Sequence, residues 1–265
     1  MENYKNVPMS CYYCKGHTGQ VVAEKDDMRF KCFGIDKRIM RCGSCGLVQL
    51  IPQWTATELD YLYSTYWQKD DFKGQTPKVK ISKYLTKYLK PTDNILEVGC
   101  GHGDNLRYLR SKGFRVTGID KAPTELGVKV DYKDLEVTGW DVIYAVHLFE
   151  HIEDPRSFIQ WLKENGRKFI LEIPSLDNPL MKLESYRKFC WYPYHLFFYD
   201  KETIKLLFPR ARIELMQEYG IINHLRWLIK GKPGNWNPEI PVLDRMYKFI
   251  LTKLGYGDTV VVSNA

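Results

Sequence analysis

The sequence predicts an α/β protein with a doubly wound, mainly parallel sheet, preceded by a small zinc ribbon. Two observations predict this fold. Apolar strand-like runs alternate with amphipathic helix-like runs after residue 91, which is typical of a parallel sheet with helices on both faces. Two C-x-x-C pairs, "CYYC" and "CGSC", precede this alternation. We therefore expect a zinc ribbon over 1–52, a helical lid or linker over 53–90 and the α/β domain over 91–265.

The cysteine pairs predict a metal site. Two residues between cysteines let both sulfurs of one tight turn face the same ion, and four thiolates fill the tetrahedral shell of a structural Zn²⁺. Gly46, and Gly16 one step later in its own pair, would supply left-handed turns that aim backbone N–H groups at the sulfurs. The alternative is two unrelated thiol pairs, and His17 or Cys32 could substitute as ligands. The predicted ligands are Cys11, Cys14, Cys42 and Cys45.

Composition excludes several other classes of protein. The 265 residues are 44% hydrophobic and 27% charged, as in ordinary globular proteins. We find no apolar run of about 18 residues and no apolar signal-peptide core in "MENYKNVPMS", so we expect a cytoplasmic protein without a membrane span. The net charge is +7, and the sequence contains no block of consecutive basic residues. The charge therefore permits an acidic partner without requiring one.

The elements of the α/β domain follow in order. Two amphipathic runs, 55–67 and 79–89, fill the linker before the first strand. We then expect strands ending near 98, 120, 146 and 174, with helices over 104–113 and 154–166, as read from the runs "NILEVG", "FRVTGID", "WDVIYAV", "KFILEIP", "DNLRYLRSKG" and "DPRSFIQWLKENG". Ligands of such sheets bind beyond the carboxyl ends of the strands.

The turn after the first of these strands predicts a nucleoside site. Its glycines alternate as Gly99, Gly101 and Gly103, whereas a dinucleotide fingerprint needs glycine at position 104, which is Asp104. The turn also lacks the Lys-Ser/Thr ending of a phosphate-binding P-loop.

Two carboxylates indicate which kind of nucleoside could bind at this turn. Asp120 ends the next strand, nineteen residues after Gly101, and can accept both hydroxyls of a ribose, although an isolated aspartate there could also be a helix cap. Glu97 precedes the glycines and favours an adenosine that carries a cation over one that carries phosphates.

At this point the sequence resembles a known family. "ILEVGCGHGDNL", "GID", "WDVIYAVHLFEHIEDP" and "FILEIP" resemble the successive motifs of class I S-adenosylmethionine-dependent methyltransferases, over about residues 75 to 262. The resemblance implies a seven-stranded Rossmann-like sheet ending in the strands of "ARIELMQEYG" and "TVVVSNA". It also implies S-adenosylmethionine as cofactor. The residues it assigns to that cofactor are Gly99, Gly101, Gly103 and Asp120 and, beside the adenine, Asp134 and Leu135, to which the charge argument above adds Glu97.

Transfer of a methyl group to a hydroxyl needs a base that takes the hydroxyl proton. Such a base is expected beyond the carboxyl ends of the strands, and three histidines are candidates. His195 is the first choice, because the family often has a histidine at this point, before the helix expected in "DKETIKLLF". His147 and His151 follow the fourth strand in "HLFEH". The sequence "HLFEH" matches the zinc-protease motif H-x-x-E-H, which lies within a helix in those enzymes. Here it follows a strand and precedes "EDP", so we do not expect a protease. Related ubiquinone-pathway enzymes carry carboxylate and histidine ligands for a divalent ion at this turn, and His147 stands where their first ligand is Glu.

Aromatic residues are candidates for the acceptor side. Tyr192 and Tyr194 could stack on a sugar or ring, with packing in the core as the alternative. Tyr66 could close the cofactor cleft, although core packing is the more common explanation for aromatics at its amphipathic spacing. Acceptor specificity is expected in the segment 222–250, whose centre is rich in Gly, Pro, Asn and Trp.

Several functions remain open at this stage. The ribbon resembles those of sugar and polysaccharide enzymes, so the leading interpretation is methylation, favoured at oxygen, of a sugar or nucleotide-sugar for cell-surface glycan. The alternatives are O-methylation of a quinone-type phenol, methylation of RNA with the ribbon binding nucleic acid, and a non-catalytic cofactor-binding protein. Few clustered basic side chains in the ribbon argue against RNA.

Overall fold

The computed structural model describes residues 10–23, 37–62, 85–122, 125–136, 138–191, 194–217, 220–231 and 240–264. The chain divides into two compact units, which we treat separately. The ribbon unit comprises Met1–Thr55, Pro174–Pro209 and Ile213–Val261, and the sheet unit comprises Ala56–Ile173, Arg210–Arg212 and Val262–Ala265. The domain boundaries predicted at residues 52 and 90 stay predictions.

The sheet unit is built on parallel strands, as the alternation of apolar runs predicts. Neighbouring strands pair in parallel in the order β8-β7-β4-β5-β6. The inner residues of β4, β5, β7 and β8 are mostly buried, because a parallel sheet is covered on both faces, whereas both residues of the edge strand β6 are exposed. The strands are β4 (Asn94–Val98), β5 (Arg115–Asp120), β6 (Val128–Lys129), β7 (Trp140–Val146) and β8 (Gly166–Pro174).

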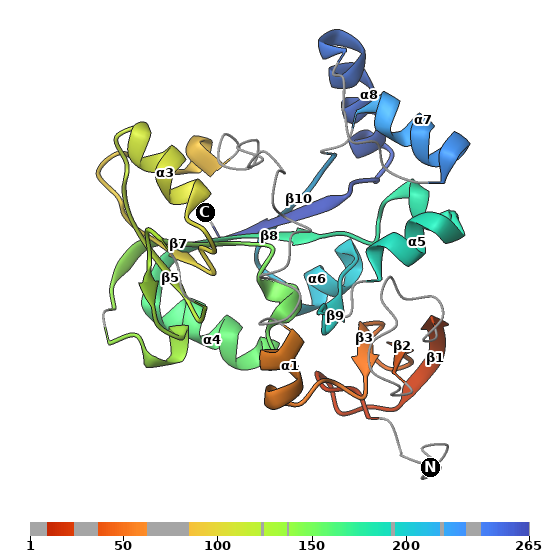
Figure 1. The fold of residues 1–265 in the computed structure, drawn as a ribbon, viewed down its shortest axis with the longest axis horizontal. Helices are drawn as coiled ribbons and strands as arrows, with labels where there is room; N and C mark the ends of the chain where they lie inside the picture. Colours follow the sequence, from red (N-terminus) through yellow and green to blue (C-terminus); the bar gives the residue numbers. More distant parts are fainter. Residues whose placement is uncertain are drawn as a thin grey trace. The chain divides into compact units, whose positions relative to one another are not determined.

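Two helices connect these strands. α3 (Asp104–Ser111) leads from β4 to β5, and α4 (Pro155–Asn165) leads from β7 to β8 in the opposite direction across the sheet. Right-handed crossovers in opposite directions place their helices on opposite faces, as Figure 1 shows for α3 and α4. Asp154 caps α4 through the N–H groups of its first turn, and each helix buries its apolar stripe, which includes Leu106, Leu109, Phe158 and Leu162.

Two further strands extend this order. With β10 (Arg212–Met216) and β11 (Thr259–Ser263), the seven-stranded sheet has the order β10-β11-β8-β7-β4-β5-β6. The predicted fold class, with its final pair of strands, is therefore confirmed.

The ribbon unit contains a four-stranded antiparallel sheet. β1 (Thr18–Ala23), β2 (Arg38–Cys42) and β3 (Val48–Ile51) form the hairpins expected of a ribbon, and β9 (Phe197–Phe198) adds a fourth strand from far along the chain. The Leu50 amide donates to the Leu196 carbonyl at 2.9 Å next to this pairing. The ribbon is thus joined to the segment after β8 by backbone hydrogen bonds that the sequence did not predict.

Helices make up the rest of the ribbon unit. α6 (Lys201–Leu207) follows its N-cap Asp200, which forms a capping box with Thr203. α5 (Glu184–Cys190) was not predicted, and the insertion at 222–250, expected to be a loop at its centre, contributes α7 (Ile221–Lys230) and α8 (Pro241–Lys253). The residues between these two helices lie outside the described ranges.

The linker is described only at its ends, by α1 (Ala56–Leu62) and the short helix Thr86–Tyr88. Across the ranges that the structure describes, no helix has both the length and the apolar character needed to cross a bilayer.

Candidate functional site

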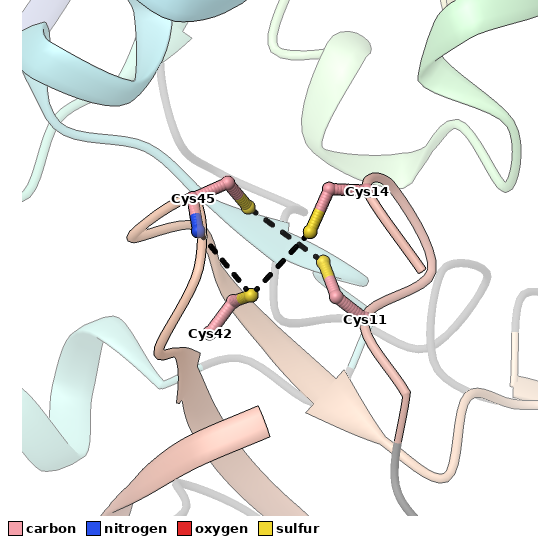
Figure 2. A group of neighbouring side chains, drawn as sticks. All are labelled: Cys11, Cys14, Cys42 and Cys45. Atoms are coloured by element: carbon pink, nitrogen blue, oxygen red, sulfur yellow. Dashed lines mark hydrogen bonds between the residues drawn. The ribbon is translucent and has the colours of Figure 1, made fainter. Parts of the chain in front are cut away.

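The four predicted cysteine ligands converge on one point. Two come from the turn before β1, Cys42 ends β2 and Cys45 lies in the turn that follows it, and all four sulfurs face inward in Figure 2. The Sγ atoms of Cys11 and Cys45 are 3.8 Å apart, and those of Cys14 and Cys42 are 3.6 Å apart. A tetrahedral zinc shell with Zn–S bonds of about 2.3 Å has S···S edges of roughly 3.8 Å. The donor set and its spacing therefore fit zinc with no position left for water.

Backbone donors support the thiolate form. The N–H groups of Ser44 and Cys45 point to Cys42 Sγ at 3.3 and 3.5 Å, and Gly16 N–H points to Cys14 Sγ at 3.3 Å. Although burial alone would raise it, these donors lower the pKa of Cys42 to about 7. Burial raises the pKa of Cys11 and of Cys45, so a bound cation has to displace the protons of these two thiols.

The two cysteine turns differ from expectation at one position. Gly46 follows its cysteine pair with φ +74°, as predicted, but in the first turn the left-handed residue is Lys15, with φ +61°, and not Gly16. Gly16 is needed for space instead, since a Cβ there would lie 2.4 Å from Ser44 Oγ. His17 is exposed and outside the sulfur group, and Cys32 lies outside the described residues.

The glycine turn of the sheet unit has the backbone that the sequence predicts. Gly99, Gly101 and Gly103 all have positive φ, at 76°, 51° and 80°. A Cβ on Gly99 would lie 2.9 Å from Leu148, and one on Gly103 would lie 2.8 Å from Leu126, so both are closely packed. A Cβ on Gly101 would meet nothing within 4 Å. The middle of the turn is thus open to a ligand.

Asp120 is held against this turn. Gly101 N–H donates to its Oδ2 and Ala122 N–H to its Oδ1, each at 2.8 Å. No helix begins at Asp120, so the helix-cap interpretation is wrong for this residue. Each carboxylate oxygen keeps a further lone pair, which can accept a hydroxyl of a ribose at the carboxyl edge of the sheet.

Glu97 is a buried carboxyl group at the end of β4. Asn105 Nδ2 donates to its Oε1 at 2.9 Å. Burial raises the pKa of Glu97 to about 7, more than the hydrogen bond from Asn105 and the nearby Tyr144 hydroxyl lower it, and the charges of Asp120 and Asp104 add to the rise. A nearby cation would favour ionisation, so this carboxyl group fits a positively charged ligand.

We expect Glu97→Gln to stabilise the ligand-free protein and to weaken the binding of the predicted cationic cofactor, S-adenosylmethionine, which is called the donor below. The raised pKa means that the folded state is most favoured at low pH and loses this advantage as pH rises through about 7, at a cost of about 3 kcal/mol. Wild-type donor affinity should rise about tenfold from pH 6 to pH 8 as Glu97 ionises, and the variant should lose this dependence. Thermal unfolding and calorimetry across that range measure both; an unchanged pH profile in the variant would refute the role of Glu97.

Gly101→Ala should weaken donor binding. The alanine must adopt a positive φ, which costs roughly 1–2 kcal/mol, and its methyl group would enter the open space of the turn. Gly113→Ala is the matched control, because Gly113 also has positive φ and open surroundings but lies after α3, away from the turn. Equal donor affinity in the two variants, measured by calorimetry, would contradict a ligand at Gly101.

A group of histidines and buried carboxylates lies at the carboxyl ends of β7 and β8. His147 has φ +51°, and its N–H donates to the carbonyl of Glu172. Its Nδ1 lies 3.5 Å from Glu150 Oε1 and its Nε2 lies 4.0 Å from Glu172 Oε1, while His151 Nε2 lies 3.9 Å from Glu150 Oε1. Both glutamates are buried, whereas the His147 side chain is 42% exposed. An exposed imidazole backed by two carboxylates can accept a proton and hold the resulting charge.

The same group corrects and extends the sequence interpretation. Residues 149–151 form a 3₁₀ turn and not an α-helix, so the geometry of a zinc-protease motif is absent from "HLFEH". Sequence reasoning missed Glu150 and Glu172 as site residues. A signal for Glu172 was present, because an acid inside the apolar run "FILEIP" repeats the pattern of Glu97 in "ILEVG".

The other predicted residues are placed as follows. Asp134 is exposed and Leu135 half-buried in the short turn after β6, at the carboxyl edge of the sheet. His195 and Tyr194 are half-buried in the ribbon unit just before β9, and the His195 ring lies 5.7 Å from that of Phe198. Tyr66 and Tyr192 lie outside the described residues. The roles of all these residues stay predictions.

Comparison with known proteins agrees with this geometry. A family model described as a methyltransferase domain matches residues 73–218. A ubiquinone biosynthesis O-methyltransferase of Marinobacter nauticus is 36% identical over 155 residues, which are 47% of this chain and 64% of that protein. A probable fatty acid methyltransferase of Mycobacterium tuberculosis is 35% identical over 81 residues, 24% of this chain and 19% of that protein. The chain thus spans less than two thirds of the length of these two relatives.

One solved structure with a match over most of its length is a SAM-dependent methyltransferase from Archaeoglobus fulgidus. The match has 19% sequence identity and a TM-score of 0.46, and it covers 69% of this chain and 92% of that chain.

Proposed function

Because this chain belongs to the methyltransferase domain family, we propose that it is an O-methyltransferase that uses S-adenosylmethionine and acts on a hydroxyl of a small phenol- or quinol-type molecule. The observation that carries the proposal is the left-handed glycine turn joined to Asp120 at 2.8 Å, with open space at Gly101 and the carboxyl group of Glu97 behind it. This arrangement suits an adenosine that carries a positive charge.

Each residue of the turn has a separate task in binding the donor. When bound, the donor supplies an electrophilic methyl group on a positively charged sulfur. Asp120 accepts the two ribose hydroxyls, Gly101 lets the ligand approach the backbone, and ionised Glu97 attracts the cationic end. Asp134 and Leu135 border the adenine.

His147 is the base that we propose for the acceptor. The acceptor oxygen forms a bond to the methyl carbon as the carbon–sulfur bond breaks, and the hydroxyl proton passes to the imidazole. The carboxylates of Glu150 and Glu172, 3.5 and 4.0 Å from the ring, stabilise the imidazolium that forms. His195 is the alternative base.

The relatives support a phenolic acceptor. Several of them are named ubiquinone biosynthesis O-methyltransferase, including those of Marinobacter nauticus and Rickettsia canadensis, at 36% and 28% identity. A phenol also loses its proton more readily than a sugar hydroxyl, which suits a histidine base near neutral pH.

A nucleotide-sugar is the second candidate acceptor. The four-cysteine ribbon favours it, because this ribbon resembles those found with sugar and polysaccharide enzymes. In this proposal the zinc is structural in either case, since four sulfurs complete its shell.

A panel of acceptors tests the function. Labelled methyl donor is supplied with catechols and quinols, nucleotide-sugars, and RNA, and we expect transfer to oxygen of the phenols. His147→Gln should lower kcat about 10²- to 10⁴-fold and leave donor affinity unchanged, whereas His195→Gln should have a smaller effect. Transfer to nucleotide-sugars or RNA alone would overturn the phenol proposal, and a larger kcat loss in His195→Gln would reassign the base.

A further inference from the structure

The pair of helices α7 and α8 in the ribbon unit presents apolar side chains to solvent. The two helices pack against one another and lie side by side in Figure 1. On α7, Leu225, Leu228 and Ile229 are 46%, 60% and 77% exposed, and they recur at positions i, i+3 and i+4, which places them on one face.

α8 repeats this arrangement over a longer stretch. Its exposed apolar side chains recur at helical spacing, so they form a stripe along the helix. They are Val242, Leu243, Met246, Phe249 and Ile250, between 50% and 70% exposed, and Leu254 follows directly after the helix.

The polar side chains of the same helices face inward. On α7, His224 and Asn223 are buried, and His224 contacts both Gln217 and the Tyr247 hydroxyl of α8. Asp244 of α8 is also buried and accepts the N–H groups of Ile221 and Ile240, each at 2.9 Å. Trp227 of α7 is buried as well, so the inner side combines polar groups with this aromatic residue. The outer face, by contrast, is a broad apolar surface, and such exposed surfaces mark interaction sites.

The charge of this pair identifies the partner. The described residues 220–231 and 240–254 hold five cationic side chains. Lys230, Arg245 and Lys253 are exposed, and Arg226 and Lys248 are half-buried. The single acidic residue among these described residues is Asp244, which is buried and accepts the two N–H groups given above. A second copy of the chain placed on this face would bring cations against cations. An anionic lipid surface complements both the apolar stripe and its charges.

We propose that the α7–α8 face, defined by the exposed apolar residues named above, binds peripherally to anionic membranes. α8 is 13 residues long, which suits a helix lying in the headgroup region. The face belongs to the ribbon unit and the glycine turn to the sheet unit, so the inference does not depend on the proposed reaction.

Vesicle binding by the full chain tests this proposal. We expect the protein to cosediment with vesicles of phosphatidylcholine and phosphatidylglycerol at least about tenfold more than with phosphatidylcholine alone, and salt should weaken the binding. The double variant Ile229→Asp, Phe249→Asp should lose at least about tenfold in this binding. Arg245→Glu with Lys253→Glu should remove the preference for anionic vesicles.

Leu206→Asp is the matched control, because Leu206 is 50% exposed on α6, outside this face, and should bind vesicles as the wild type does. Thermal unfolding and donor affinity should stay unchanged in the double variant, which separates lost binding from lost folding. Absence of vesicle binding by the wild type, equal binding by the double variant, or a dimer in light scattering that the double variant dissociates would each overturn the proposal.

Discussion

Cys42→Ser is expected to abolish metal binding and to unfold the ribbon. Cys42 ends β2 and carries two backbone N–H contacts as well as its place among the four sulfurs. Apparent zinc-binding energies of about 10–16 kcal/mol in small zinc domains act as folding energy, so losing one of four ligands removes most of the ribbon's stability. Elemental mass spectrometry should find one zinc in the wild type and none in the variant.

The unfolding should spread beyond the ribbon itself. Leu50 is hydrogen-bonded to Leu196, β3 pairs with β9, and Arg41 contacts Asp200 at 3.2 Å at the start of α6. Hydrogen exchange should therefore accelerate at residues 196–199 in the variant. Cys190→Ser, which removes a thiol outside the cluster, is the control and should keep both zinc and protection. A metal-free wild type of the same thermal stability would contradict this account.

Asp120→Ala is expected to weaken donor binding at least about 100-fold. Two hydrogen bonds to a charged acceptor contribute about 1.5–3 kcal/mol each, and the substitution also removes the anchor of the Gly101 N–H. Calorimetric titration with S-adenosylmethionine measures the loss.

A second carboxylate of the same unit provides the control. Glu125 is 69% exposed and contacts Arg107 at 3.5 Å, so Glu125→Gln removes a negative charge without touching the turn and should bind the donor normally. Donor affinity retained in Asp120→Ala would show that this carboxylate does not hold the ribose.

Much of the sheet unit could be predicted because its signals are local. Alternating glycines at 99, 101 and 103 require a left-handed backbone, and all three have it. The cysteine pairs likewise predict a shared ion from their spacing alone, and the structure brings their sulfurs together. In both cases the sequence pattern acts over a few residues, so neighbouring side chains were enough to interpret it.

The features that escaped prediction depend on contacts between distant segments. Pairing of β9 with β3 joins residues about 150 apart, and no local pattern marks it. His147 contacts Glu172 only because β7 and β8 are neighbours in the sheet. The outward apolar faces of α7 and α8 were missed because helical spacing of apolar residues is normally interpreted as an inward face.

Titration of the wild-type protein with S-adenosylmethionine tests the central claim most directly. The account predicts one site per chain with clear heat, binding that strengthens from pH 6 to pH 8, and no comparable heat from NAD or ATP. Clear binding of NAD or ATP, with none of S-adenosylmethionine at any pH in that range, would contradict it.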